Sequence, residues 1–164
     1  MPRPLRNIAQ GLTHHACSRC HGKRNLLLGK YGRKYFIESI RECQERYDFE
    51  LIAAEIVANH IHLIIKTNMD KQTISLIMQY IKARIAEKYN RAMGETGAFW
   101  NERFGSTVIE EAENPQEYLL WLLWYIGYNA TFSPLFSIQR KCSKNQDLHL
   151  PLFKNFLKHS IVLT

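Results

Sequence analysis

Long hydrophobic runs, a disulfide-type cysteine pattern, internal repeats and low-complexity segments are all missing from this sequence of 164 residues. No apolar run is long enough to cross a membrane, and no apolar segment with a small-residue cleavage site follows the basic start MPRPLR. Only four cysteines are present, without the pairing pattern of a small secreted domain. We therefore expect a cytoplasmic protein with no membrane segment.

What the sequence does contain is enough apolar and aromatic side chain for one folded unit. Apolar residues make up 46% of the chain and aromatic residues 12%, which excludes a disordered protein. This length suits one domain with a genuine core and is short for two. We expect a single domain over residues 1–164, with a basic arm at residues 1–10 and a polar tail at about residues 139–164.

The charge is strongly positive. Lysine and arginine total 22 against 15 acidic residues, so the formal net charge is +7. A domain this basic commonly binds a polyanion, most often nucleic acid, although many small basic proteins carry such charge for solubility alone.

Hydrophobic periodicity predicts the elements in the order β-α-β-β-α-β-α. A strand at residues 11–19 precedes a helix at 33–47, strands at 49–57 and 60–66, a helix at 71–93, a strand at 107–110 and a helix at 116–128. A last short helix is expected at 150–162. This order is typical of an α+β ferredoxin-like sandwich with an antiparallel sheet. We expect the helices on one sheet face and a functional site on the other, open face.

Two histidines in the predicted strand at residues 60–66 form a candidate metal site. Because alternate residues of a strand face the same side, His60 and His62 share one face while Ile61 points into the core. Paired imidazoles are a common metal platform. The alternative is a pair of exposed or hydrogen-bonded histidines with no ligand.

A second candidate lies on the predicted helix at residues 116–128. Tyr125 and Asn129 are four residues apart and therefore share a helix face, offering a phenolic nucleophile and an amide oxygen ligand. The alternative is that Tyr125 belongs to a core stripe with Tyr118, Trp121 and Leu122.

A third candidate is a structural zinc site at the cysteine pair Cys17 and Cys20. The spacing suits zinc, and His14, His15 and His21 are nearby in the sequence. A zinc site requires two further ligands, however, and no second close pair is present.

Several motifs together resemble the single-tyrosine HUH transposases, and in particular their REP-associated branch. Residues 57–63, Val-Ala-Asn-His-Ile-His-Leu, are similar to that family's Met-Pro-Asn-His-hydrophobic-His-Leu motif. Residues 99–104 resemble its Trp-x-x-Arg-Phe element, and residues 125–129 resemble its Tyr-Ile-x-x-Asn-Pro segment. The opening Pro-Arg-Pro and the Ser-Arg at residues 18–19 are also similar. The chain departs from the pattern at Ala58 and Ala130, where proline is usual, and at Cys20, where glycine is common.

The resemblance implies a metal-dependent nickase and strand transferase for single-stranded or hairpin DNA. Tyr125 would form a 5′-phosphotyrosine, and His60, His62 and Asn129 would hold a divalent ion, Mg²⁺ or Mn²⁺. The protein would act as a monomer or a homodimer. Candidate DNA contacts are Arg19, Lys23, Arg24, Lys82, Arg84, Trp100 and Arg103. The alternative is a catalytically silent or domesticated nucleic-acid-binding module on the same fold.

Overall fold

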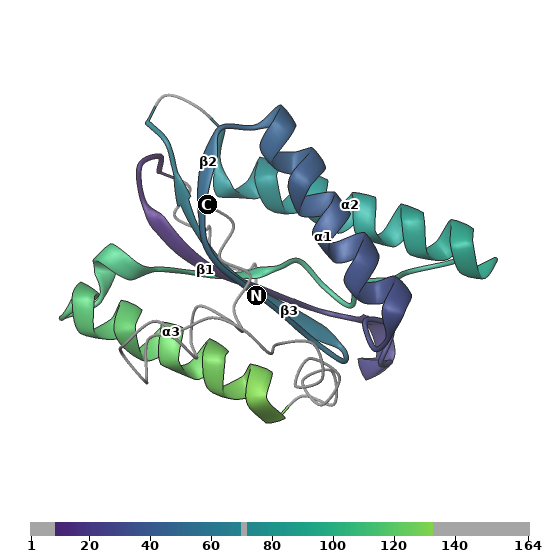
Figure 1. The fold of residues 1–164 in the computed structure, drawn as a ribbon. Helices are drawn as coiled ribbons and strands as arrows, with labels where there is room; N and C mark the ends of the chain where they lie inside the picture. Colours follow the sequence, from purple (N-terminus) through teal and green to yellow (C-terminus); the bar gives the residue numbers. More distant parts are fainter. Residues whose placement is uncertain (1–8, 70–71, 133–164) are drawn as a thin grey trace, which may run out of the picture.

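The computed structural model describes residues 9–69 and 72–132, with residues 128–132 described by their backbone alone. The expected helix at 150–162, the tail from 139 onward and most of the arm at 1–10 lie outside the described residues. Within them, the predicted order of strands and helices is confirmed (Figure 1). The elements are β1 (Thr13–Arg19), α1 (Lys30–Arg46), β2 (Phe49–Val57), β3 (His60–Thr67), α2 (Ile74–Met93), β4 (Gly105–Val108) and α3 (Pro115–Phe132), with short 3-10 helices η1 (His21–Lys23) and η2 (Ile109–Glu111).

The four strands form one antiparallel sheet in the order β2-β3-β1-β4. The α+β, ferredoxin-like class is therefore confirmed. The two central strands are β3 and β1, and their register pairs Cys17 with His62 and Arg19 with His60. Directly paired residues of neighbouring strands point to the same face. This register therefore places β1 side chains beside both histidines.

Helices α1 and α2 cover one face of the sheet and enclose the main core. Ile61, Leu63 and Ile65 of β3 point into this core, as the alternation predicts. The apolar stripe of α2 meets them with fully buried side chains such as Ile77 and Ile81. Thr73 precedes the first turn of α2, and Gly94 ends the helix in the left-handed conformation with φ 64°.

Helix α3 lies on the opposite face of the sheet, so the expectation that all helices cover one face is wrong (Figure 1). The reason is visible in the apolar residues of that face. Ile64 and Ala53 are fully buried there against Leu122 and Ile126 of α3. The alternation that points Ile61 and Ile65 toward the main core necessarily turns Ile64 to the histidine face, where it requires cover.

The remaining differences from the expected elements are small. The last strand is β4 at Gly105–Val108, earlier than the expected 107–110, and Ile109 begins η2 instead. Helix α1 starts earlier than expected, after Gly29, whose φ of 96° favours glycine. No helix in the described part of the chain has the length and apolar character needed to cross a membrane.

Candidate active site

A cavity of about 440 Å³ opens where β1 and β3, the loop before β4, and α3 meet. Five of the candidate active-site and DNA-contacting residues contribute to its wall. These are Arg19, His60, His62, Arg103 and Tyr125. The other lining residues are Cys17, Ser18, Asn101, Glu102 and Gly105. The fold thus brings residues from positions 17 to 125 to one place.

The two histidines of β3 lie next to each other at this cavity. Their ring centroids are 4.9 Å apart, and the rings are nearly perpendicular. His62 is only 8% exposed, whereas His60 is half-buried. The two rings are therefore close enough for their nitrogens to serve one ion.

Hydrogen bonds occupy one nitrogen of each ring. His60 Nδ1 lies 2.7 Å from Asn59 Oδ1. Because an amide oxygen only accepts, His60 Nδ1 carries the proton and Nε2 keeps a lone pair. His62 Nδ1 lies 3.0 Å from His15 Nε2, and His62 Nε2 is buried with no hydrogen-bond partner in the part of the chain that the structure describes. A buried imidazole nitrogen that makes no hydrogen bond is able to ligate a cation.

Burial keeps these imidazoles neutral. Desolvation lowers the pKa of His62 to about 3, with smaller contributions from the charged forms of His15 and His60 and from Arg19. Desolvation also lowers the pKa of His60, and Arg19 adds to the effect. Neutral imidazoles are the form that binds metals, so this chemistry suits a divalent ion.

The ligand set is incomplete without a group of another type. Within residues 9–69 and 72–132, no three His, Cys, Asp or Glu side chains gather in a metal-binding group. The third ligand implied by the resemblance, Asn129, belongs to α3, but its side chain lies outside the described part of the chain.

Tyr125 of α3 reaches the same cavity and contacts the histidine pair. Its ring centroid lies 5.9 Å from that of His62, in an edge-on arrangement. On its other side the ring stacks on Trp121, with centroids 5.5 Å apart, and Trp121 in turn stacks on Tyr118. Leu122 is fully buried in the cluster under α3, and Trp121 is 53% exposed. Tyr125 is partly buried against this cluster, as the core-stripe alternative expects, and it also lines the cavity.

Comparison with known proteins identifies the family. Residues 9–119 match the model of the family described as "Transposase IS200 like", which is more than half of the chain. The chain belongs to the IS200-like transposase family. It is therefore an HUH-type tyrosine transposase, as its motifs suggest. The matched region contains His60 and His62 and ends before Tyr125.

Solved structures share the fold of this transposase. One is a REP-associated tyrosine transposase bound to a REP hairpin, with 17% identity over 80% of this chain and 72% of that chain, and a TM-score of 0.59. Another is a proposed transposase from Deinococcus radiodurans R1, with 15% identity over 76% of this chain and 97% of that chain, and a TM-score of 0.50. No curated protein matches the sequence.

The candidate DNA-contacting cations of the transposase are spread over several surfaces. Arg19 and Arg103 line the cavity, and Arg103 also borders a second hollow of about 350 Å³ beside α2. Lys23 and Arg24 are exposed at η1, where Arg24 pairs with Glu95 at 2.9 Å. These four lie on or near β1 and the loop before β4.

Trp100 and Lys82 hold each other in place. The indole nitrogen of Trp100 donates to the Lys82 carbonyl oxygen at 2.8 Å, and the ring packs against the main core. The Lys82 ammonium lies 5.5 Å from the centre of that ring and donates to the Glu102 carbonyl oxygen. These contacts fix the loop that carries Arg103 to the cavity.

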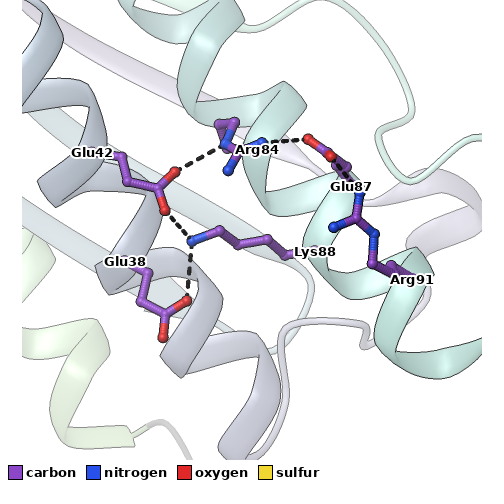
Figure 2. A network of polar contacts seen from close by, with 6 residues as sticks. All are labelled: Glu38, Glu42, Arg84, Glu87, Lys88 and Arg91. Carbon is purple, nitrogen blue, oxygen red and sulfur yellow. Dashed lines mark hydrogen bonds and ion pairs between the residues drawn. The ribbon is translucent and has the colours of Figure 1, made fainter.

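Arg84 lies elsewhere, between α1 and α2 (Figure 2). Its guanidinium donates to Glu42 at 2.9 Å and to Glu87 at 2.6 Å. The structure therefore does not bring Arg84 to the candidate site.

The cysteine pair does not converge on a common site. Cys17 lines the cavity, whereas Cys20 is fully buried in the main core, where desolvation raises its pKa to about 11. Both thiols are free. The zinc alternative finds no ligand group in the described residues.

Three residues beside the histidines have no role in the sequence prediction of this site: His15, Asn59 and Glu55. Asn59 was available from the motif, since it directly precedes His60. His15 and Glu55 are revealed only by strand register, which pairs Glu55 directly with His62. Glu55 is 6% exposed, and neither of its carboxyl oxygens has a hydrogen-bond partner among the residues that the structure describes. Desolvation raises the pKa of Glu55 to about 8.

Proposed function

We propose that this transposase nicks and rejoins single-stranded DNA through Tyr125, with a phosphotyrosine intermediate. The observation that carries the proposal is the position of the Tyr125 ring, edge-on to His62 at 5.9 Å in a cavity that also holds Arg19 and Arg103. The cavity thus combines a proposed nucleophile, two neutral imidazoles and two cationic side chains.

The proposed step is an exchange of phosphodiester bonds. The Tyr125 phenol gives its proton to water as its oxygen attacks the phosphorus. The bond from phosphorus to the 3′ oxygen breaks, and that oxygen takes a proton from water and leaves as a 3′ hydroxyl, so that the protons balance. The 5′ phosphate stays on Tyr125 until another 3′ hydroxyl displaces it. A neutral phenol is a weak nucleophile, so the attacking oxygen benefits from nearby positive charge. Arg19 and Arg103 supply such charge at the cavity wall.

His60 and His62 would hold a divalent ion through their Nε2 atoms, with Asn129 of α3 as the proposed third ligand. When bound, Mg²⁺ or Mn²⁺ supplies Lewis-acid stabilisation of the developing charge on the phosphate oxygens. Imidazole ligands by themselves favour softer ions, and the family resemblance is the ground for preferring these two. Asn59 keeps the His60 ring oriented, because its Oδ1 accepts a hydrogen bond from His60 Nδ1–H.

We propose single-stranded DNA carrying a hairpin as the substrate. The similarly folded REP-associated transposase is bound to a REP hairpin, and this chain has the net charge of +7 that phosphate binding favours. Arg19 and Arg103 would contact phosphates near the scissile bond, and Lys23 and Arg24 would contact phosphates further along the strand. We exclude Arg84 from this surface, and we assign Lys82 and Trp100 to supporting the Arg103 loop.

The experiment is a search for a covalent adduct between the protein and a labelled single-stranded hairpin in the presence of Mn²⁺. Tyr125→Phe keeps the ring, its stack on Trp121 and its contact with His62, but it removes the attacking oxygen. We expect this variant to bind the hairpin normally and to form no adduct.

Tyr118→Phe and Tyr128→Phe are the matched controls, because both residues belong to the same helix. Each is expected to form the adduct at close to the wild-type yield. An adduct in Tyr125→Phe, with the phosphate mapped to another residue, would refute the role of Tyr125. Hairpin binding with no adduct in the wild type would favour the silent binding module.

A further inference from the structure

We propose that His15 is a positioning residue for His62: it accepts a hydrogen bond from His62 Nδ1–H and thereby keeps His62 Nε2 unprotonated. This inference rests on the proposed metal site, and it concerns a residue that the motifs do not include. His15 would act through His62 alone, because it does not line the cavity itself.

The sheet register brings the two rings together. His15 of β1 pairs with Ile64, and His62 pairs with Cys17, so the two histidines are diagonal neighbours on the same face. Their rings are stacked, with centroids 5.3 Å apart and planes 14° from parallel. His15 Nε2 and His62 Nδ1 are 3.0 Å apart, which is hydrogen-bond distance.

Only one direction of this hydrogen bond suits the surroundings. If His62 Nδ1 accepted, the proton of neutral His62 would sit on Nε2, a buried atom with no hydrogen-bond partner among the described residues. A buried donor without a partner is unfavourable, and a protonated Nε2 has no lone pair for a cation. If His62 Nδ1–H donates to His15 Nε2, the Nδ1 proton has an acceptor and Nε2 keeps a lone pair for the proposed metal ion.

His60 also has a hydrogen-bond acceptor at its Nδ1 atom, but this acceptor comes from a different residue type. Asn59 Oδ1 accepts from His60 Nδ1 at 2.7 Å. One imidazole is therefore oriented by the preceding residue in the chain and the other by a neighbouring strand. Partners of this kind fix the tautomer and orientation of a ligand histidine, and losing one typically weakens metal affinity by about 10–100-fold.

Two variants separate the hydrogen bond from the packing. His15→Phe keeps a stacked ring and removes the acceptor, whereas His15→Gln places an amide oxygen close to the position of Nε2. We expect calorimetric titration of the DNA-free protein with Mn²⁺ to show about 10–100-fold weaker binding for His15→Phe and nearly wild-type binding for His15→Gln. His21→Phe, at an exposed histidine of η1, is expected to bind as the wild type does.

A measurement on the unaltered protein removes the dependence on variant folding. Imidazole ¹⁵N NMR of the metal-free wild type is expected to show His62 protonated at Nδ1 and bare at Nε2. The opposite tautomer would overturn the proposal, as would equal Mn²⁺ affinity in His15→Phe and the wild type, or equal losses in the Phe and Gln variants.

The outcome also distinguishes this inference from the proposed function. If His60→Ala and His62→Ala abolish Mn²⁺ binding while His15→Phe binds normally, only the positioning role fails. If the wild type binds no Mn²⁺, the metal site and the positioning role fail together. If the His15 variants behave as expected but Tyr125→Phe still forms an adduct, the nucleophile assignment fails and the positioning role stands.

Discussion

The two faces of the sheet differ in how their charged and ionisable side chains are paired. Between α1 and α2, the charged side chains pair with one another: Glu42 accepts from both Arg84 and Lys88, and Lys88 also reaches Glu38 (Figure 2). On the α3 face, Glu55 and His62 are buried, and both carboxyl oxygens of Glu55 and the Nε2 atom of His62 have no hydrogen-bond partner within the described residues. Paired charges at the edge of a large apolar core favour stability, whereas buried unpaired groups cost stability and are typical of functional sites.

The pKa shifts follow the same division. Hydrogen bonding and charge from Lys88 and Arg84 lower the pKa of Glu42. Desolvation raises the pKa of Glu55 instead. The same residue type is thus held charged in one layer and neutral in the other. The layer formed by α1 and α2 stabilises the fold. The layer under α3 holds buried unpaired groups that lower the stability of the fold, at the place where we propose that the chemistry occurs.

The largest expected effect concerns the two apolar clusters. Ile81→Ala opens a cavity among the fully buried residues between α2 and the sheet, and we expect a loss of about 2–5 kcal/mol in the free energy of unfolding. Leu122→Ala affects the smaller cluster under α3, so we expect much of its effect as local opening of that helix. Urea denaturation and amide hydrogen exchange measure the two effects.

The exchange pattern is the sharper test of this comparison. Ile81→Ala is expected to raise exchange rates throughout the sheet and helices, and Leu122→Ala to raise them chiefly within α3. Uniform acceleration by both substitutions would mean that the two layers unfold as one unit.

The next effect is a pH dependence centred on Glu55. Its pKa is raised from 4.5 to about 8 in the folded protein. Between these values the unfolded chain loses the proton and the folded protein keeps it. The group therefore reduces stability as pH rises through this window, by up to about 1.4 kcal/mol per pH unit. Glu55→Gln keeps the shape without ionising, so we expect it to gain stability relative to the wild type as the pH rises from 5 to 8.

Urea denaturation at several pH values measures this gain. Glu50→Gln is the matched control, because Glu50 lies on the same strand and is exposed. It is expected to leave the pH profile unchanged. Parallel profiles for the wild type and Glu55→Gln would show that Glu55 is not held neutral by the fold.

Local patterns predicted the elements well because each rests on contacts near in sequence. The stripe Ile77, Ile81 and Ile85 marks α2, and alternation in β3 separates Ile61 and His62 onto two faces. The position of α3 and the partners of His62 depend instead on how distant segments pair. In the sequence, His15 stands near only the cysteine pair. Its contact with His62 follows from the register between β1 and β3, which brings the two rings together.

The smallest expected effect is that of replacing Arg84, and this substitution tests whether the layer formed by α1 and α2 has any part in DNA binding. Arg84 is about one-third exposed and is paired with Glu42 and Glu87. Arg84→Gln is therefore expected to lower the free energy of unfolding by less than about 1 kcal/mol.

Arg19→Gln removes a cation from the cavity wall, and it is expected to reduce the slope of log affinity against log salt by about 0.7 for a single strand. Fluorescence anisotropy with a labelled hairpin, in a Tyr125→Phe background that prevents covalent capture, measures both slopes. Because the Arg84 guanidinium is held between two carboxylates on the other side of the sheet, its variant is expected to keep the slope of the parent protein. An equal loss of slope in both variants would mean that DNA also contacts the α1 and α2 layer, and the division of labour between the two faces would not hold.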